Sequence, residues 1–202
     1  MPRIALTLKG IPFTLHNEIP WHSTTITPEH NPLEKLPVLV HPNGFSVYQT
    51  PHILNYIVEK FADRGPSLLP GNLETDLLAK QIVALSVGSL DALVLLGWEV
   101  RRPEEKQSQL WIERQTRKID NSLRAFKEYV EDAEGREFVL GKEMTIADIG
   151  IGCAVGGIDF TGMRPEWRTL YPALVEYFER LDELEVFKES RPVMFDLTEQ
   201  VV

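Results

Sequence analysis

Residues 31–57, NPLEKLPVLVHPNGFSVYQTPHILNYI, decide the fold of this chain, because two strands and the start of a helix follow one another within them. The branched apolar residues at 37–40 predict a strand, and residues 45–48 predict its return strand. Asn43 and Gly44 lie between them, and an Asn-Gly pair between two apolar runs is a strong signal for a tight turn. The segment therefore predicts a β-hairpin that leads directly into a helix.

The helix after the hairpin is predicted from a start signal and an apolar stripe. Thr50 is expected to cap it, because its hydroxyl can accept a hydrogen bond from an early helical amide. Pro51 suits the first helical position, since it has no amide to leave unpaired. The apolar residues that follow share one face, which can pack against a sheet: Ile53, Leu54, Ile57 and Phe61.

The rest of the first 62 residues predicts one more helix and long irregular stretches. Residues 2–9 have helical character and end at Gly10, which tolerates the left-handed conformation that often closes a helix. Residues 11–15 can form a short strand, although Pro12 removes one ladder donor and limits it to a sheet edge or a strand start. Residues 16–35 contain three prolines among Ser, Thr and His, so they predict a loop with at most one helical turn.

The second part of the chain is predicted to be all helical. Residues 63–73 are rich in Pro and Gly and indicate a linker between a first domain, 1–62, and a second domain, 74–202. Two long helices are expected at 74–102 and 104–131, where apolar residues recur with helical spacing.

The sharpest helix start lies at Thr145, because Asp148 three residues later completes an acidic form of the capping box. A buried helix is expected to continue to about residue 158. Its glycines fit close helix packing better than a dinucleotide-binding loop, which would have to follow a strand. A last amphipathic helix is expected at 171–184, with a short one at 186–191.

Composition and charge exclude several classes of protein. The chain has 202 residues, of which 43% are hydrophobic and 25% charged, as in a soluble globular protein. A formal net charge of −9 argues against a nucleic-acid partner. No uninterrupted apolar run reaches the length of a membrane span, so a cytoplasmic protein is expected. Cys153 is the only cysteine, which excludes an internal disulfide, and the histidine spacing fits no metal site.

Three segments, NPLEKLPVLV, YQTPHILNYI and MTIADI, make the chain similar to the cytosolic glutathione transferase superfamily. The resemblance implies a thioredoxin-like N-terminal domain, with an incomplete or rearranged sheet, followed by a helical bundle. It also implies glutathione as the cofactor. The backbone of Leu36, before a cis Pro37, would pair with the cysteinyl part. Gln49 and Thr50 would hold the γ-glutamyl head group, and Lys35 would lie near the glycyl end.

The chemistry of these residues agrees with the resemblance. Thr50 is expected at a helix N-terminus, where unpaired amides and the helix dipole favour an anion. Gln49 supplies both a donor and an acceptor, which suits an α-amino acid head group. The corners at 35–37 and 49–51 are expected at the same end of the small sheet, where they can hold a ligand that carries carboxylates.

The sequence departs from the family pattern at its beginning. Family members normally start with a central strand and a loop carrying the Tyr, Ser or Cys that stabilises the glutathione thiolate, whereas this sequence starts at the helix after that loop. Three explanations stay open: residues 11–15 pair with the strand at 37–40, the sheet is incomplete, or the sequence is truncated. The loop hydroxyls that remain as candidates for approaching the thiol are Ser23, Thr24 and Thr25.

The resemblance implies a glutathione-dependent enzyme that acts on a specific electrophilic or unsaturated, hydrophobic small molecule. Conjugation and reversible thiol addition, which permits cis-trans isomerisation, would share the same bound thiol. The alternative is a non-catalytic module that keeps the fold for binding or assembly. Leu95 and Trp98, near the end of the first long helix, are either the wall of the electrophile site or bundle core. A homodimer is expected by analogy with the family.

Overall fold

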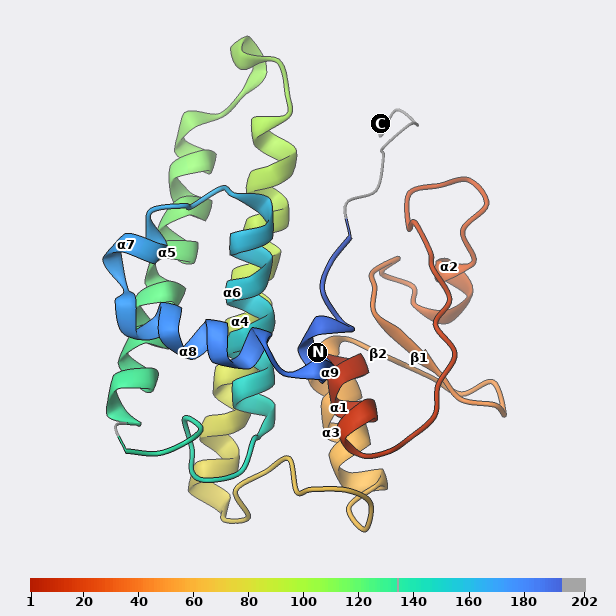
Figure 1. Ribbon diagram of the computed structural model, residues 1–202. Coiled ribbons are helices and arrows are strands. Elements are labelled where there is room, and N and C mark those ends of the chain that lie inside the picture. The colour runs from red at the N-terminus through yellow and green to blue at the C-terminus, as the bar shows by residue number, and fades with distance from the viewer. Residues whose placement is uncertain (134, 194–202) are drawn as a thin grey trace. The chain divides into compact units, whose positions relative to one another are not determined.

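The computed structural model describes residues 1–133 and 135–193, and the chain divides into two compact units (Figure 1). The first unit is Met1–Ser67 together with residues 192–193, and the second is Leu68–Arg191. The boundary after Ser67 lies inside the stretch for which the sequence indicates a linker.

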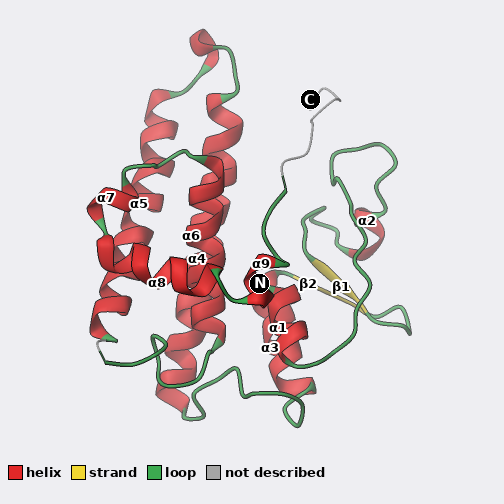
Figure 2. Ribbon diagram, viewed as in Figure 1, coloured by secondary structure: helices red, strands yellow, loops and turns green. Residues whose placement is uncertain are grey.

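The first unit holds a two-stranded hairpin and three helices within the described residues (Figure 2). Its elements are α1 (Pro2–Leu8), α2 (Thr27–His30), β1 (Val38–Val40), β2 (Ser46–Tyr48) and α3 (Thr50–Lys60). The two strands run antiparallel. The predicted hairpin is therefore confirmed, and each strand begins one residue later than the sequence indicates.

The core of the first unit forms where α1 packs against α3. The buried residues are Ile4, Ala5 and Leu6 from α1 and Ile53, Leu54 and Ile57 from α3. The helix α1 ends as predicted, since Gly10 follows it with a φ of 63°, a conformation that glycine adopts without strain. Because α3 also contacts both strands, the core helix positions the hairpin.

Residues 11–15 do not form a strand, contrary to the sequence prediction. Pro12 cannot donate to a ladder, and Phe13 and Leu15 are exposed, so no buried face holds the segment in a sheet. Among the described strands, β1 pairs with β2 alone. The proposed pairing of residues 11–15 with the strand at 37–40 is therefore wrong, and the described sheet has two strands.

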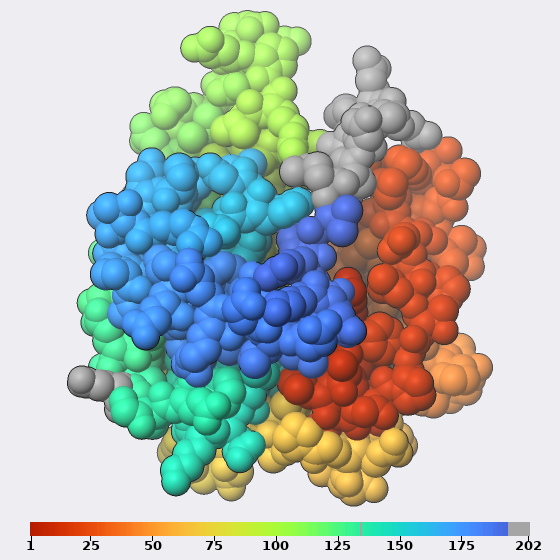
Figure 3. Space-filling view, in the orientation of Figure 1, coloured from red at the N-terminus to blue at the C-terminus, as the bar shows by residue number. Residues whose placement is uncertain are grey.

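The second unit is a helical bundle. Its elements are α4 (Leu73–Val100), the 3₁₀ helix η1 (Glu104–Lys106), α5 (Gln109–Asp132), α6 (Ile146–Thr161), α7 (Trp167–Leu170), α8 (Pro172–Asp182) and α9 (Glu185–Lys188). The long helix α4 packs against α5 and α6, and α8 packs against α5 and α6 in turn. In the space-filling view, α7 and α8 (blue) cover one side of this bundle (Figure 3).

The second long helix starts later than the predicted residue 104. Glu104–Lys106 form a separate 3₁₀ turn, and α5 begins at Gln109. The reason is Ser108, a preferred N-cap residue, whose side chain accepts a hydrogen bond from the Trp111 amide. The local cap therefore outweighs the apolar periodicity that suggested an earlier start.

The helix α6 begins at the capping box that the sequence predicts. The Thr145 hydroxyl accepts from the Ala147 amide at 3.2 Å, and the Asp148 carboxylate accepts from the Thr145 amide at 2.6 Å. The same carboxylate accepts from the Val139 amide at 2.9 Å and from the Tyr177 hydroxyl. Asp148 is fully buried. Burial, together with the Asp148 carboxylate, raises the pKa of Tyr177 above its usual value.

The glycines of α6 permit close helix packing, as predicted. A Cβ on Gly152 would lie 2.5 Å from Cε1 of Phe187, and a Cβ on Gly157 would lie 2.7 Å from Cδ2 of Leu90. Neither distance is tolerable for a real side chain without a shift of its neighbour. The two glycines therefore let α9 and α4 approach α6.

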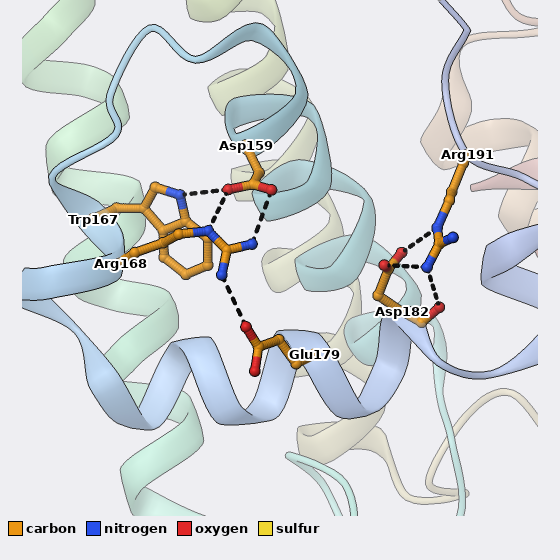
Figure 4. A network of polar contacts seen from close by, with 6 residues as sticks. All are labelled: Asp159, Trp167, Arg168, Glu179, Asp182 and Arg191. Atoms are coloured by element: carbon orange, nitrogen blue, oxygen red, sulfur yellow. Dashed lines mark hydrogen bonds and ion pairs between the residues drawn. The ribbon is translucent and has the colours of Figure 1, made fainter.

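A surface network holds the short helix α7 against α6 and α8 (Figure 4). Arg168 donates to the two carboxylate oxygens of Asp159 at 2.7 and 2.9 Å and to Glu179 at 2.9 Å. Trp167 Nε1 also donates to Asp159, at 3.3 Å. The hydrogen bond from Arg168 lowers the pKa of the Asp159 carboxyl. These charged groups thus pair with one another and link α7 to α6 and α8.

Within the described residues, one helix, α4, is long and apolar enough to cross a membrane by length and composition. Isolated charges such as Lys80 and Asp91 interrupt its apolar residues, so it holds no uninterrupted apolar run of that length. One such helix is weak evidence for a membrane span, because the core helix of a helical bundle has the same length and composition. Here α4 packs against α5 and α6.

Candidate functional site

A buried asparagine holds the first corner of the hairpin. Asn31 is fully buried, its Nδ2 donates to the Lys35 carbonyl at 2.7 Å, and its Oδ1 accepts from the Leu33 amide at 3.0 Å. The Glu34 amide donates to the Asn31 carbonyl at 2.9 Å, and Glu34 has a φ of 53°. These bonds close a tight loop before Leu36–Pro37, whose peptide bond is cis, as the resemblance implies.

The second corner differs from the predicted cap. Gln49 is the N-cap of α3, and its carbonyl accepts from the His52 and Ile53 amides at 3.0 Å each. Thr50 is the first helical residue, so its predicted capping role is wrong, and Pro51 follows it at the second position. Gln49 has φ 68° and ψ 119°, a region that residues with side chains rarely enter. Its side chain makes no capping hydrogen bond, so the cap does not consume the amide group.

The register of the hairpin brings these two corners together. Val38 lies opposite Tyr48 in the ladder, so the next residues outward, Pro37 and Gln49, leave the sheet at the same end. Opposite Cα atoms in an antiparallel ladder are about 4.5 to 5.5 Å apart, so the two corners begin from neighbouring positions. The expected meeting of the corners at one end of the sheet is confirmed.

The corner pair offers donors suited to an anionic ligand. The N-terminus of α3, an eleven-residue helix, carries the positive end of the helix dipole beside the Thr50 hydroxyl. Gln49 supplies an amide donor and an amide acceptor. Leu36 and Lys35 are exposed on the facing loop, where the first offers backbone groups and the second a positive charge. A peptide with a zwitterionic end and a second carboxylate matches this set of groups.

The three loop hydroxyls have different surroundings. Thr25 is committed to its loop, because its Oγ1 donates to Glu18 at 2.7 Å and lies 2.8 Å from the hydroxyl of Thr27. That hydrogen bond lowers the pKa of the Glu18 carboxyl. Ser23 and Thr24 are exposed. Of the three candidates, only Thr25 has its hydroxyl tied up by these hydrogen bonds within the loop.

Leu95 and Trp98 lie on the last three turns of α4, outside its fully buried face. Leu95 is 40% exposed, and Trp98 is half-buried. The guanidinium carbon of Arg101 lies 5.7 Å from the centre of the Trp98 ring, within the range of a cation–π contact. Trp98 thus borders a cationic side chain that the sequence prediction did not single out.

Other groups in the described part of the chain suggest no competing site. No three His, Cys, Asp or Glu side chains in that part come together to hold a metal ion. A cavity of about 140 Å³ is lined by Asp120, Leu123, Arg164, Trp167, Leu170 and Tyr171. Its charged side chains are already paired, since Arg164 donates to Asp120 at 2.8 and 3.1 Å.

Comparison with known proteins identifies the family. Models of the glutathione S-transferase N-terminal and C-terminal domains match residues 1–60 and 109–180. The uncharacterised GST-like protein YibF of Escherichia coli is 33% identical over 189 residues, which are 94% of this chain and 91% of the relative. The chain belongs to the glutathione S-transferase superfamily. Its thioredoxin-like N-terminal domain and helical C-terminal domain are those of that superfamily.

Two further proteins are similar to this chain over most of its length. A glutathione S-transferase of Methylobacterium radiotolerans, solved in complex with glutathione sulfonate, has a TM-score of 0.89 and 39% identity. The match covers 99% of this chain and 92% of that one. A probable maleylacetoacetate isomerase of Drosophila melanogaster is 27% identical over 199 residues, which are 94% of this chain and 75% of the relative.

Two residues of the candidate site, Asn31 and Arg101, were not singled out from the sequence. Each has a local sequence signal. Asn31 precedes a proline at the start of a loop, and asparagine side chains commonly bond to nearby backbone in such turns. Arg101 follows Trp98 by three residues, the spacing at which helical side chains are neighbours.

Proposed function

We propose that this protein binds glutathione at the two hairpin corners and uses its thiol on an electrophilic small molecule. Gln49 and Thr50 hold the γ-glutamyl end, the Leu36 backbone beside cis Pro37 pairs with the cysteinyl part, and Lys35 lies near the glycyl carboxylate. The observation that carries the proposal is the ladder pair Val38–Tyr48, which brings both corners to one end of the sheet. The glutathione sulfonate bound to the 39% identical transferase supports the choice of ligand.

The reaction requires the thiolate, since a free cysteine thiol has a pKa of about 8.5 and the thiol form is a poor nucleophile. Groups that donate hydrogen bonds to the sulfur stabilise the thiolate, and we propose that the loop hydroxyl of Ser23 or Thr24 is such a donor. Thr25 is the third candidate, but its bond to Glu18 must break before its hydroxyl can reach a ligand.

In the conjugation reaction, the thiolate sulfur forms a bond to the electrophilic carbon. With an unsaturated carbonyl compound, the alkene electrons move to the carbonyl as an enolate, which then takes a proton from water. In the second candidate reaction the addition reverses after rotation about the former double bond, so the carbon–sulfur bond breaks and the thiolate is released. The similarity to a probable maleylacetoacetate isomerase favours keeping this isomerisation as a candidate.

Isothermal titration calorimetry with glutathione tests the site directly. The wild type should bind saturably, and Gln49→Ala should bind about tenfold or more weakly, as expected for losing hydrogen bonds to a charged head group. Gln81→Ala is the matched control, since it removes an exposed glutamine from α4 and should leave the affinity unchanged. Equal binding by wild type and Gln49→Ala would refute the site. Absence of saturable binding by the wild type would favour the non-catalytic alternative.

The fate of glutathione separates the two reactions. Incubation with a cis unsaturated carbonyl compound, followed by quantification of free glutathione and of both alkene isomers, gives a direct answer. Conjugation consumes one glutathione for each molecule of substrate, whereas isomerisation yields the trans alkene with glutathione recovered in full.

We further propose that the protein works in the cytoplasm as a homodimer without nucleic-acid or membrane partners. Family resemblance supports the dimer, and the formal net charge of −9 supports the lack of a polyanion partner. Light scattering coupled to size-exclusion chromatography tests the dimer, which should have twice the chain mass of 23.1 kDa.

A further inference from the structure

The last turns of α4 carry a graded stripe of side chains. Leu95, Trp98 and Arg101 are spaced three residues apart, so they lie on neighbouring positions of one helical face. The stripe passes from an apolar side chain that is 40% exposed, through a half-buried indole, to an exposed guanidinium. A ligand along this face would meet an apolar surface, an aromatic ring and a positive charge in that order.

Two neighbouring arginines at the end of α4 have different partners. Arg102 is committed to a carboxylate, because its Nη1 donates to Glu99 at 3.0 and 3.2 Å. Arg101 has no carboxylate partner among the described residues. Its contacts are the Trp98 ring and a long hydrogen bond of 3.4 Å from Nη1 to the Gly97 carbonyl. A guanidinium has five donors, so most of the donors of Arg101 are available to a ligand.

The chemistry of this pair selects a class of ligand. A guanidinium fork matches the geometry of a carboxylate, with which it can form two parallel hydrogen bonds. A flat conjugated system stacks well on an indole ring. Among the described residues, Arg101 therefore differs from its neighbour Arg102, whose guanidinium is paired with the Glu99 carboxylate.

We infer that the electrophile handled by this protein is a flat, unsaturated compound bearing a carboxylate, which Arg101 binds while Trp98 and Leu95 contact the conjugated part. The inference rests on the proposed function, in which a bound glutathione thiol reacts with an electrophilic small molecule. It makes Arg101 a specificity-determining residue that acts on the substrate and not on the thiol.

A structural role for Arg101 predicts a different result. A cation at a helix C-terminus stabilises the helix through its dipole and the last carbonyls, and the Gly97 contact is of this kind. Loss of that role would lower thermal stability and affect all substrates alike. The test therefore needs two substrates that differ only in the carboxylate.

Trans-3-benzoylacrylic acid and its methyl ester form such a pair, because both carry the same aryl enone. Glutathione addition is followed by loss of enone absorbance, and the uncatalysed rate is subtracted. Arg101→Gln should lower kcat/KM for the acid roughly 10- to 100-fold and change the value for the ester by less than about twofold. Arg101→Lys should lie between wild type and Arg101→Gln for the acid, since it keeps the charge and loses the fork.

Arg102→Gln is the matched control and should leave kcat/KM unchanged for both compounds, because its guanidinium is already paired with Glu99. Equal losses for acid and ester in Arg101→Gln, or no loss for either, would overturn the inference and leave the proposed function standing. A wild type that binds no glutathione and conjugates neither compound would overturn both.

Discussion

The N-termini of α3 and α6 are built in opposite ways. At α6 the Thr145 hydroxyl and the Asp148 carboxylate fill the helix start, and that carboxylate also binds Val139 and Tyr177. At α3 the cap residue is Gln49, whose backbone is held at a φ of 68° and whose side chain does not cap. One helix start is capped by its own side chains, and the other has no side-chain cap.

The contrast teaches how a helix N-terminus can be assigned to structure or to binding. Both ends carry the same partial positive charge, so the dipole alone cannot separate them. The two helix starts differ in whether buried side chains accept hydrogen bonds from the first backbone amides of the helix. The closed start at α6 should govern stability, and the open start at α3 should govern affinity for glutathione.

The largest effect is expected at Asp148. Asp148→Ala removes the acceptor of three residues, Val139, Thr145 and Tyr177, and leaves their buried donors unpaired. The free energy of unfolding should fall by about 3 to 5 kcal/mol, measured by urea denaturation. Asp148→Asn keeps one carbonyl oxygen and should lose less. A loss below about 1 kcal/mol for Asp148→Ala would break the distinction between the two helix starts.

The same substitution at the two helices sharpens the contrast. Thr145→Val should lower the free energy of unfolding by about 1 to 2 kcal/mol, the usual cost of losing an N-cap side chain. Thr50→Val should change it by less than about 0.5 kcal/mol, yet weaken glutathione binding about tenfold. Denaturation and calorimetry on both variants give the four values. A stability loss at Thr50 as large as that at Thr145 would contradict the assignment.

Gln49 allows backbone strain to be separated from ligand contact. Gln49→Gly and Gln49→Ala both remove the side-chain amide, so both should bind glutathione more weakly. Only glycine adopts the positive φ freely, so Gln49→Gly should be about 1 kcal/mol more stable than Gln49→Ala. Thermal denaturation of the two variants side by side measures this difference. Equal stability would mean that the cap holds no strain.

The smallest effect is expected at Asp159, the partly exposed carboxylate near the other end of α6. Because Arg168 lowers the pKa of Asp159 in the folded protein, the pair contributes stability above the unfolded pKa of about 3.9. That contribution is lost as the pH falls through the lower folded pKa. The stability difference between wild type and Asp159→Asn should therefore shrink between pH 6 and pH 3 in denaturant titrations. A difference that grows toward low pH would contradict this pairing.

The sequence predicted the closed helix start because its signal is local. Thr145 and Asp148 are three residues apart, and their bonds form within one helical turn. The hairpin and the long helices were predictable for the same reason, through a turn signal and apolar spacing. The start of α5 was misplaced because the Ser108 cap, a single residue, overrode the periodicity before it.

The features that escaped prediction depend on partners or on backbone angles. Residues 11–15 have alternating apolar character, but a strand exists only when a neighbouring strand accepts its hydrogen bonds, and β1 pairs with β2 alone among the described strands. The N-cap was assigned from the sequence to Thr50 instead of Gln49. A positive φ at a glutamine has no sequence signal, because glutamine rarely adopts it. The sequence does not tell which of the two adjacent arginines pairs with Glu99, and the structure shows that it is Arg102.

The hairpin register has a consequence for how the family can diversify. Residues 31–60 contain the Asn31 loop, the three-pair ladder, both corners and helix α3, so one contiguous piece of chain carries the whole proposed cofactor site. The α4 stripe lies elsewhere in the chain and shares no residue with it. Under both proposals, mutations in the α4 stripe would alter the choice of second substrate without changing the cofactor segment, and a graft of residues 31–60 would transfer that segment as a unit.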